Sequence, residues 1–403
     1  MATKPLSWPS ERCVNPACSQ RCASRFTAHC SAFCSGFSLV EVMVAMVIGL
    51  LGIIVMMQMF SVFEGQKRTT GGGDDAISSG AVSLYGAQRN IQQSGWGISS
   101  VEVIGCTVTG LVVGAAPIPL IPVTINSPLI TGQDANTDTL LIVSGNGNGS
   151  VEGDTIASVP AANAYDVGRL TGFSAGPPPD RVVAVPQTRP APCNLALTTV
   201  TGVVFPNVLV SAGFAGIVPG DKLFNLGTAP TVRAYAVRNQ NLTVCDYTTS
   251  DCGLAANNGD TTVWVPVANN VVSLRAQYGR DNTDMAAAMD GVVDVWDQTR
   301  PVPAFPAGSN TANACALIRA SAVRIVLVAR SSQPEKTADW PALTAHVTPA
   351  APLWAGSAAA AISLPDPDPT WPTGLDFRYK VFQTVVPLRN VHIPPVSKVG
   401  PPC

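Results

Sequence analysis

One carboxylate lies at the edge of a long uncharged stretch near the N-terminus. Glu41 precedes sixteen residues, 42–57, that carry no polar side chain, and the apolar run continues to residue 63 with only Gln58 and Ser61 as polar interruptions. A lone acid in a membrane span costs on the order of 2 to 3 kcal/mol or less near the edge, and such a group usually has a partner. Glu41 is therefore expected to bind a partner group that compensates its charge. The alternative is a carboxylate that merely lies at the headgroup level.

Cysteine supplies a second kind of chemistry. Six of the eleven cysteines lie beyond residue 36, namely Cys106, Cys193, Cys245, Cys252, Cys315 and Cys403. An even number in an oxidising compartment indicates disulfides, and Cys245 and Cys252, which enclose a polar hexapeptide, are the most plausible local pair. The other four allow three connectivities, all of which stay open. The alternative is that some of the six remain buried free thiols.

Residues 1–36 form a basic segment rich in cysteine. Its charged residues are Lys4, Arg12, Arg21 and Arg25 against Glu11, and its cysteines are Cys13, Cys18, Cys22, Cys30 and Cys34. Basic residues before a first span keep that side in the cytoplasm, so the rest of the chain is expected on the opposite side. The cysteines and His29 are zinc-type ligands, but they include no C-x2-C pair, and we expect no metal site. A misassigned translation start is another explanation for this segment.

Two glycine-containing patterns resemble functional loops without their context. Residues 172–176 match the G-x-S-x-G pattern of serine hydrolases, but three prolines follow at once, where the required helix is not expected to start. Beyond residue 36 the histidines are His346 and His392, each beside proline-rich sequence. The glycines of residues 145–149 are out of register for a dinucleotide loop. We predict no catalytic residue and no cofactor.

An acidic cluster offers oxygen ligands of the type that calcium uses. Its members are Asp281, Asp284, Asp290, Asp294 and Asp297. Their spacing misses the calcium-loop pattern, so a solvated acidic turn is the expected structure, with calcium as the alternative.

Charge and proline distribution restrict the classes of function and fold. Without residues 1–36 the chain has 20 basic and 25 acidic residues, a net charge of −5, and no basic patch is evident. Nucleic-acid binding through phosphates is therefore not expected. Residues 37–116 contain no proline, whereas 31 of the 34 prolines lie from residue 117 onward. A helical N-terminal part followed by strands and turns is the expected arrangement.

The N-terminal part is expected to contain two helical segments. Residues 37–63 would span roughly 40 Å as a helix, more than the ~30 Å hydrocarbon core of a membrane. Three consecutive glycines, residues 71–73, are expected to interrupt the helix, and Asp74 and Asp75 to cap a second one. Apolar residues at helical spacing predict the face of the second helix that packs on a sheet. They are Ile77, Ala81, Leu84, Tyr85 and Ile91.

From residue 101 the pattern changes to short β-type runs, separated by turns rich in Gly, Asn, Pro and Asp. The predicted strands are residues 102–108, 119–125, 139–144, 181–185, 198–204, 231–237, 262–267, 271–278, 320–330 and 378–388. Residues 365–372 and 394–402 are predicted to be extended surface loops. The expected fold class is α+β, with the helix after Asp75 on an antiparallel sheet.

The hexapeptide Gly36-Phe37-Ser38-Leu39-Val40-Glu41, followed by an apolar helix, resembles the type III signal of type IV pilins. The resemblance implies cleavage between Gly36 and Phe37, N-methylation of Phe37, and Glu41 as the fifth residue of the mature chain. It also implies that Glu41 pairs with the N-terminal amine of a neighbouring subunit. Such a pairing would supply the partner that a carboxylate needs in a medium of low dielectric constant.

Further stretches are similar to the PilW-type minor pilins of the type IV pilus. They are residues 66–76 (QKRTTGGGDDA), 88–91 (QRNI), 276–281 (AQYGRD), 322–331 (AVRIVLVARS) and 379–390 (YKVFQTVVPLRN). The chain departs from the family in its long leader and in glycine- and proline-rich insertions within residues 143–192. The resemblance implies a type IV pilin-like fold. Its expected parts are a cleaved leader (1–36), a transmembrane and assembly helix (37–63), an amphipathic continuation interrupted near 71–73 (64–100) and a β-rich periplasmic head (101–403).

The resemblance implies a structural subunit rather than an enzyme. The expected function is that of a minor pilin that primes or caps filament assembly and supports twitching motility and adhesion. Expected partners are other minor pilins, the major pilin, a pilus-tip adhesin, the prepilin peptidase and methylase, and the inner-membrane assembly platform. The expected location is the inner membrane, with a single span and a periplasmic head, and then the extracellular pilus. A pseudopilin of type II secretion is the alternative, and a membrane-anchored periplasmic binding protein or enzyme is a more distant one.

Overall fold

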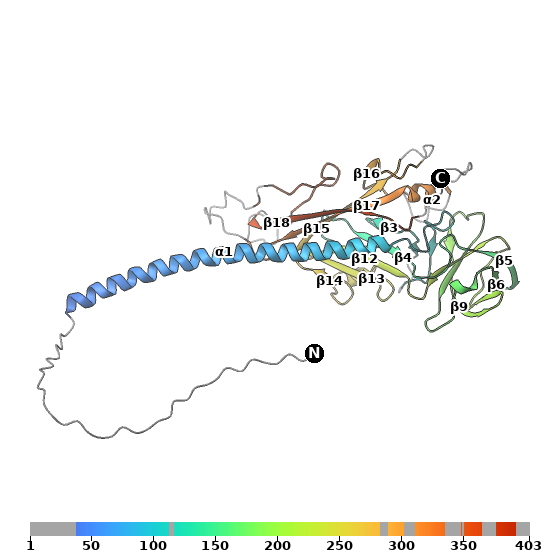
Figure 1. Ribbon diagram of the computed structural model, residues 1–403, viewed down its shortest axis with the longest axis horizontal. Helices are drawn as coiled ribbons and strands as arrows, with labels where there is room; N and C mark the ends of the chain where they lie inside the picture. The colour runs from blue at the N-terminus through green and yellow to red at the C-terminus, as the bar shows by residue number, and fades with distance from the viewer. Residues whose placement is uncertain are drawn as a thin grey trace, which may run out of the picture. The chain divides into compact units, whose positions relative to one another are not determined.

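The computed structural model describes residues 38–112, 117–282, 289–301, 311–334, 348, 350–364 and 376–391. The chain divides into two units, residues 1–62 and 63–403, and one long helix contributes residues to both. The sheets lie in the second unit, where they surround the end of that helix (Figure 1). The α+β class predicted from the sequence, with a helix packed on mostly antiparallel sheets, is confirmed.

The described elements comprise two α-helices, two short 3-10 helices and strands in four groups. The helices are α1 (Leu39–Gln93), α2 (Thr311–Ile318), η1 (Leu170–Gly172) and η2 (Ala255–Asn257). In spatial order, the three-stranded sheet is β2 (Ile118–Pro119), β1 (Thr107–Val108) and β8 (Asn194–Leu195). The five-stranded sheet is β14 (Val265–Ala268), β13 (Asn241–Asp246), β12 (Thr231–Arg238), β4 (Leu140–Ser144) and β3 (Val123–Ile125). The four-stranded sheet is β16 (Val295–Asp297), β15 (Val271–Arg280), β17 (Ala320–Arg330) and β18 (Tyr379–Pro387). A closed barrel contains β10 (Asn207–Val210), β6 (Ala164–Val167), β5 (Asp154–Ala161), β11 (Lys222–Gly227), β7 (Arg181–Val185) and β9 (Leu197–Val204).

Helix α1 is continuous through the three glycines. It comprises 55 residues, and residues 71–73 as well as Asp74 and Asp75 lie inside it. The predicted interruption and the predicted second cap are therefore wrong. Each glycine costs about 1 kcal/mol relative to alanine, but it keeps the N–H and C=O groups that form the helical hydrogen bonds. Because long helical stretches flank the glycines, continuing the helix is more favourable than forming a new nucleus.

The second half of α1 buries a face of small residues. The buried positions are Ala76, Gly80, Ser83, Ala87 and Ile91. Small side chains allow the strands to approach the helix backbone, and the Phe382 ring of β18 lies directly against Gly80. The face predicted from the sequence is therefore partly wrong, since Ile77 and Tyr85 are 46% and 67% exposed and Ala81 is exposed as well. Large side chains on the buried face would hold the helix away from the sheet.

The barrel is inserted between two neighbouring strands of the five-stranded sheet. Strand β4 ends at Ser144 and β12 begins at Thr231, and these two residues are antiparallel partners. All six barrel strands come from the chain between them, and the barrel has its own apolar core around Tyr165, Val182 and Val208. Figure 1 shows β5, β6 and β9 grouped together beyond the end of α1. The insertions expected within residues 143–192 thus include three strands of this barrel, β5, β6 and β7.

Polar contacts join the barrel to the segment that follows α1. The Arg189 guanidinium donates hydrogen bonds of 2.6 to 3.1 Å to three carbonyl groups of residues 101–104. Lys222 Nζ lies 2.7 Å from Glu102 Oε1. Burial raises the pKa of Glu102, but hydrogen bonds from Lys222 and Ser100 outweigh this effect and leave the pKa lowered. The carboxylate therefore stays ionised and holds the lysine in place.

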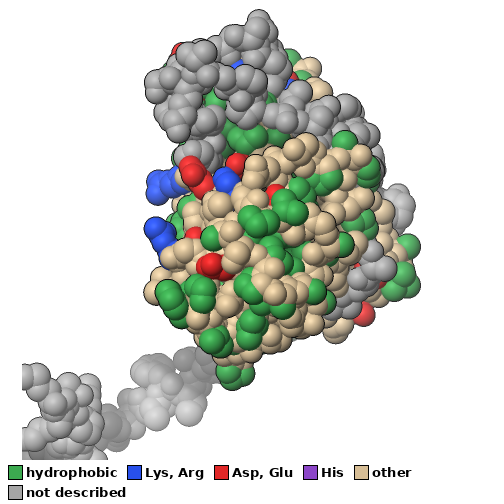
Figure 2. All heavy atoms as spheres, turned by 90° about the vertical axis from the view of Figure 1, so that its right-hand side faces the viewer, with side chains coloured by type: hydrophobic (Ala, Val, Ile, Leu, Met, Phe, Trp, Pro, Cys, Tyr) green, Lys and Arg blue, Asp and Glu red, His purple; other side chains and the backbone are tan. Residues whose placement is uncertain are grey.

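A long exposed stretch of the barrel is uncharged. Residues 194–220 contain no charged side chain, and Val204, Phe205 and Val218 are 60%, 87% and 54% exposed. Figure 2 views this end of the molecule and shows hydrophobic side chains spread over it, with most of the charged ones along one edge. Residues 194–220 therefore offer no charged group to an ionic ligand.

Replacing Gly80 by valine is expected to destabilise the protein by about 1 to 3 kcal/mol, because a Cβ there would lie 2.2 Å from Cε2 of Phe382. Gly86 is the matched control, since it lies in the same helix and a Cβ there meets nothing within 4 Å. Gly86→Val is expected to be neutral or to stabilise by a few tenths of a kcal/mol, roughly the gain in helix propensity. Thermal unfolding of the detergent-solubilised chain measures both effects, and equal losses would contradict the proposed close contact.

Candidate functional site

The first half of α1 is an exposed apolar helix of membrane length. Within Leu39–Glu64 an 18-residue window reaches a mean hydropathy of 2.7, and none of that window is buried in the described structure. At about 1.5 Å per residue the 26 residues extend roughly 39 Å, which exceeds the ~30 Å hydrocarbon core. An isolated helix satisfies its own backbone hydrogen bonds, so lipid can surround it on all sides. This segment is therefore long and apolar enough to anchor the chain in a membrane.

Glu41 lies in the first turn of this helix, where its side chain is exposed. The unpaired backbone N–H groups of a helix N-terminus favour a carboxylate by about 0.3 to 1 kcal/mol, which offsets only part of the cost of placing it in an apolar medium. The next basic residue along the helix is Lys67, 26 positions further on and about 39 Å away. A cationic partner must therefore come from the preceding residues or from another molecule. Gly36 and Phe37, the residues of the expected cleavage, lie outside the described residues.

Two disulfides of the head have both of their cysteines among the described residues. They are Cys106–Cys193 and Cys245–Cys252, with Cα–Cα distances of 4.8 and 5.9 Å. The second is the local pair that the sequence favoured. Cys315 is also disulfide-bonded, and Cys403 lies outside the described residues. The long-range bridge joins the segment after α1 to the chain that precedes β8 in the barrel region.

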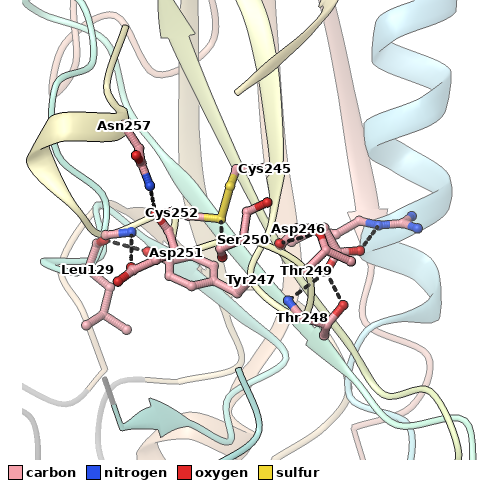
Figure 3. Close-up of a disulfide and its surroundings, with 12 residues drawn as sticks. Leu129, Cys245, Asp246, Tyr247, Thr248, Thr249, Ser250, Asp251, Cys252 and Asn257 are labelled. Atoms are coloured by element: carbon pink, nitrogen blue, oxygen red, sulfur yellow. Dashed lines mark hydrogen bonds and ion pairs between the residues drawn. A yellow bond between two sulfur atoms is a disulfide. The ribbon is translucent and has the colours of Figure 1, made fainter. Parts of the chain in front are cut away.

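The Cys245–Cys252 bridge closes a compact polar loop at the end of β13 (Figure 3). Asp246 Oδ1 accepts a hydrogen bond of 2.9 Å from the Thr248 amide. On the other side of the loop, Tyr247 donates from its hydroxyl to the Leu129 carbonyl at 2.5 Å. In Figure 3 the side chain of Asp246 lies on the side of the loop that faces α1. The disulfide thus holds a polar rim beside the helix.

The hydrolase-like pattern has no hydrolase geometry. The Ser174 hydroxyl accepts a hydrogen bond from the Gly176 amide at 3.2 Å, and the Ser174 amide donates to Asp180 Oδ2 at 2.8 Å. Residues 173–180 form a loop with no following helix, so the nucleophile turn is missing. His346 and His392 lie outside the described residues.

The acidic cluster bonds to its own backbone in the part of the chain that is described. Asp281 Oδ2 accepts from the Gly291 amide at 2.6 Å, and Asp294 Oδ2 from the Asn282 amide at 2.9 Å. Asp290 and Asp297 make similar turn contacts, and Asp297 also pairs with Arg280. Asp284 lies outside the described residues. Among the described residues, no group of three His, Cys, Asp or Glu side chains is placed to hold a metal ion.

The structure also contains a polar groove beside the end of α1 that the sequence did not predict. Its walls come from α1, β4, β12 and the residues after β18. These four segments are separated in the sequence by dozens to hundreds of residues. Taken alone, the polar residues of each segment indicate nothing more than solvent-exposed surface. No local motif could have indicated the groove.

Two family models match the chain. The model described as "Prokaryotic N-terminal methylation motif" matches residues 32–57, and the model described as "Type IV Pilus-assembly protein W" matches residues 234–390. The first match covers the expected cleavage point, Glu41 and the beginning of α1. The second runs from β12 past the end of β18. No curated protein matches the chain, and no solved structure does.

The N-terminal motif, the apolar helix and the helix-on-sheet head define a membrane-anchored pilin. Together with this motif, the match over residues 234–390 supports a PilW-type minor pilin, a protein connected with type IV pilus assembly. Proteins of these families are structural components of pili and interact with other pilus components.

The two disulfides are expected to contribute unequally to stability. The Cys106–Cys193 bridge spans 87 positions and the Cys245–Cys252 bridge spans 7. Loop-closure entropy in the unfolded chain then gives about 4.5 and about 2.5 kcal/mol, respectively. Urea unfolding of the oxidised Cys106→Ala/Cys193→Ala and Cys245→Ala/Cys252→Ala variants measures the difference. A larger loss for the short loop would show that its native contacts, not chain entropy, dominate.

Proposed function

We propose that this protein is a minor pilin that primes or caps type IV pilus assembly and thereby supports twitching motility and adhesion. One observation carries the proposal: an unburied apolar helix, Leu39–Glu64, begins with an acid in its first turn and carries the pilin methylation motif. A soluble protein would have to bury such a helix. A subunit that moves from a bilayer into a filament can leave it exposed until it meets other helices.

The mechanism is physical. The apolar segment holds the subunit in the inner membrane, with the head in the periplasm, until other pilin helices replace the lipid around it. Glu41 then pairs with the methylated N-terminal amine of Phe37 in a neighbouring subunit, after a prepilin peptidase and methylase have processed the chain after Gly36. Head-to-tail contacts of this type do not close on themselves and give an open helical filament, which carries the subunit to the cell exterior.

The proposed partners follow from this mechanism. They are the major pilin and other minor pilins, a pilus-tip adhesin, and the inner-membrane assembly platform. Glu41 supports the first group, because the next basic residue after it along the helix is Lys67, too far away to pair with it. A type II secretion pseudopilin would share the N-terminus, but the match over residues 234–390 favours the pilus.

Replacing Glu41 by alanine is expected to lower the amount of this subunit in sheared pili at least tenfold, because the helix then has no charge to pair with a neighbour's amine. Glu64→Ala is the matched control, since it removes the carboxylate at the opposite end of the same apolar segment. Immunoblots of sheared pili and of membranes provide the measurement. Normal incorporation of the Glu41→Ala subunit would refute the ion-pair mechanism.

Mass spectrometry of the subunit from sheared pili is expected to give an N-terminus at methylated Phe37. A chain that still carries residues 1–36 would contradict the proposed processing.

A deletion strain distinguishes a subunit of the type IV pilus from a subunit of type II secretion. The proposal predicts loss of twitching with normal exoprotein secretion. Loss of secretion with pili intact would support the pseudopilin instead.

A further inference from the structure

The polar groove beside the end of α1 consists of two adjoining cavities. The larger, of about 500 Å³, is lined by Asn90, Gln92, Gln93, Trp96, Ile142, Ser144, Gly145, Asn146, Thr231, Arg233, Arg389 and Asn390. The smaller, of about 420 Å³, extends along β12 to β14 and reaches the disulfide loop of Figure 3 at Asp246, Thr249 and Ser250. Asn90 and Arg233 line both cavities. We call this continuous feature the helix-end groove.

The walls of the groove are held by hydrogen bonds to the backbone. Asn390 Nδ2 donates to the Ser94 carbonyl at 2.9 Å and to the Gln93 carbonyl at 3.1 Å, so it closes the C-terminal turn of α1. The Ser144 hydroxyl donates to the Gln93 carbonyl at 2.8 Å, and Trp96 Nε1 donates to the Gly147 carbonyl at 2.8 Å. The indole is thus fixed, yet Trp96 stays 41% exposed. A fixed wall loses little conformational entropy when a ligand binds.

Other polar groups on the groove have unused hydrogen-bonding capacity. Within the described part of the chain, the side chains of Gln92, Gln93 and Arg389 make no hydrogen bond or ion pair. Arg233 is held by two residues. Its Nη1 donates a hydrogen bond of 3.3 Å to Asn90 Oδ1, and its Nε lies 3.8 Å from Asp246 Oδ2. No Asp or Glu lines the larger cavity, so the Arg389 guanidinium faces it without a compensating acid, whereas Arg233 is paired with Asp246 outside this cavity. This cavity favours a ligand with negative charge.

The composition of the groove indicates the class of ligand. A side-chain amide carries both an NH2 donor and a C=O acceptor, so it suits hydroxyl groups. A guanidinium binds a carboxylate with two parallel hydrogen bonds. An indole offers an apolar surface to C–H groups. In the larger cavity a peptide added as a strand is disfavoured, because β4 and β12 already pair on both sides. The larger cavity also disfavours a hydrophobic peptide anchor, since its apolar side chains are Ile142 and Trp96, whereas the valines of the groove line the smaller cavity.

We propose that the helix-end groove binds an acidic oligosaccharide. Arg389 binds a sugar carboxylate at the open edge of the larger cavity, and the amides of Gln92 and Gln93 bind ring hydroxyl groups. Trp96 packs against the apolar side of a sugar ring. Arg233 lies at the junction of the two cavities and contacts the next residue of the chain, which extends toward the disulfide loop. This site includes neither the apolar segment Leu39–Glu64 nor Glu41.

The test is calorimetric titration of trigalacturonate into the detergent-solubilised full chain. The proposal expects saturable binding that Arg389→Gln weakens at least about tenfold, the effect of losing a charged hydrogen-bonded pair. Gln93→Ala, which leaves the net charge unchanged, is expected to weaken binding severalfold. Arg169→Gln is the matched control, because Arg169 is an exposed arginine of the barrel region outside the groove. An uncharged galactose trisaccharide is expected to bind at least about tenfold more weakly than trigalacturonate.

Three results would overturn the proposal. The first is the absence of saturable trigalacturonate binding up to about 10 mM, which corresponds to less than about 3 kcal/mol of affinity. The second is an equal effect of Arg389→Gln and Arg169→Gln, which would indicate general charge attraction. The third is triglutamate binding as tightly as trigalacturonate and with the same sensitivity to Arg389→Gln, since the groove would then select carboxylates rather than sugars. All three substituted side chains lie on the surface or line the open groove, so the variants are expected to keep the fold. Thermal unfolding of each variant checks this.

Discussion

The close contact between the second half of α1 and the sheets is the interaction on which the head depends. Residues of α1, β3, β4, β12, β15, β17 and β18 share one apolar core, and the helix enters it with small side chains. Gly80 is the tightest point, because the Phe382 ring occupies the space that any side chain would need. The first half of the same helix has the opposite requirement. Its side chains are large and apolar on all sides, which suits lipid or other helices but not a sheet at close range. One continuous helix therefore combines two packing chemistries.

The sequence predicted the long, strongly patterned elements well. The runs 181–185 and 320–330 coincide with β7 and β17, and the apolar segment was placed within two residues of its observed start. It failed where a residue's intrinsic preference competed with tertiary structure. Residues 71–73 were expected to break the helix because glycine is a poor helix former. They are helical nevertheless, because the helix on both sides continues through them. The buried face was misjudged because hydrophobicity, not side-chain size, was used to choose it, so Tyr85 was placed inside.

The barrel and the groove could not be read from local patterns, for different reasons. Strands β5 and β11 lie in sequence rich in Gly, Pro and Asn, and their partners come from distant runs, so neither alternation nor turn spacing identified a closed sheet. The groove depends on side chains that only the fold brings together. Arg389 and Gln93 are nearly 300 residues apart, and each is unremarkable in its own segment. Cysteine was the exception, because a polar hexapeptide between Cys245 and Cys252 leaves few alternatives to a local bridge.

The barrel insertion explains why the groove lies where it does. The chain leaves the five-stranded sheet at Ser144 and returns at Thr231, and both residues line the groove. The connecting turns after β4 stay away from the sheet, because Gly145 and Gly147 run against the backbone of the barrel strand β11. A Cβ on Gly147 would lie 2.5 Å from the Asn225 carbonyl oxygen, so the turn can follow this course only with glycine. The space between this turn and the end of α1 is the larger cavity. The chain that forms the barrel therefore also forms one wall of the groove, at the point where it leaves β4 and where it returns to β12.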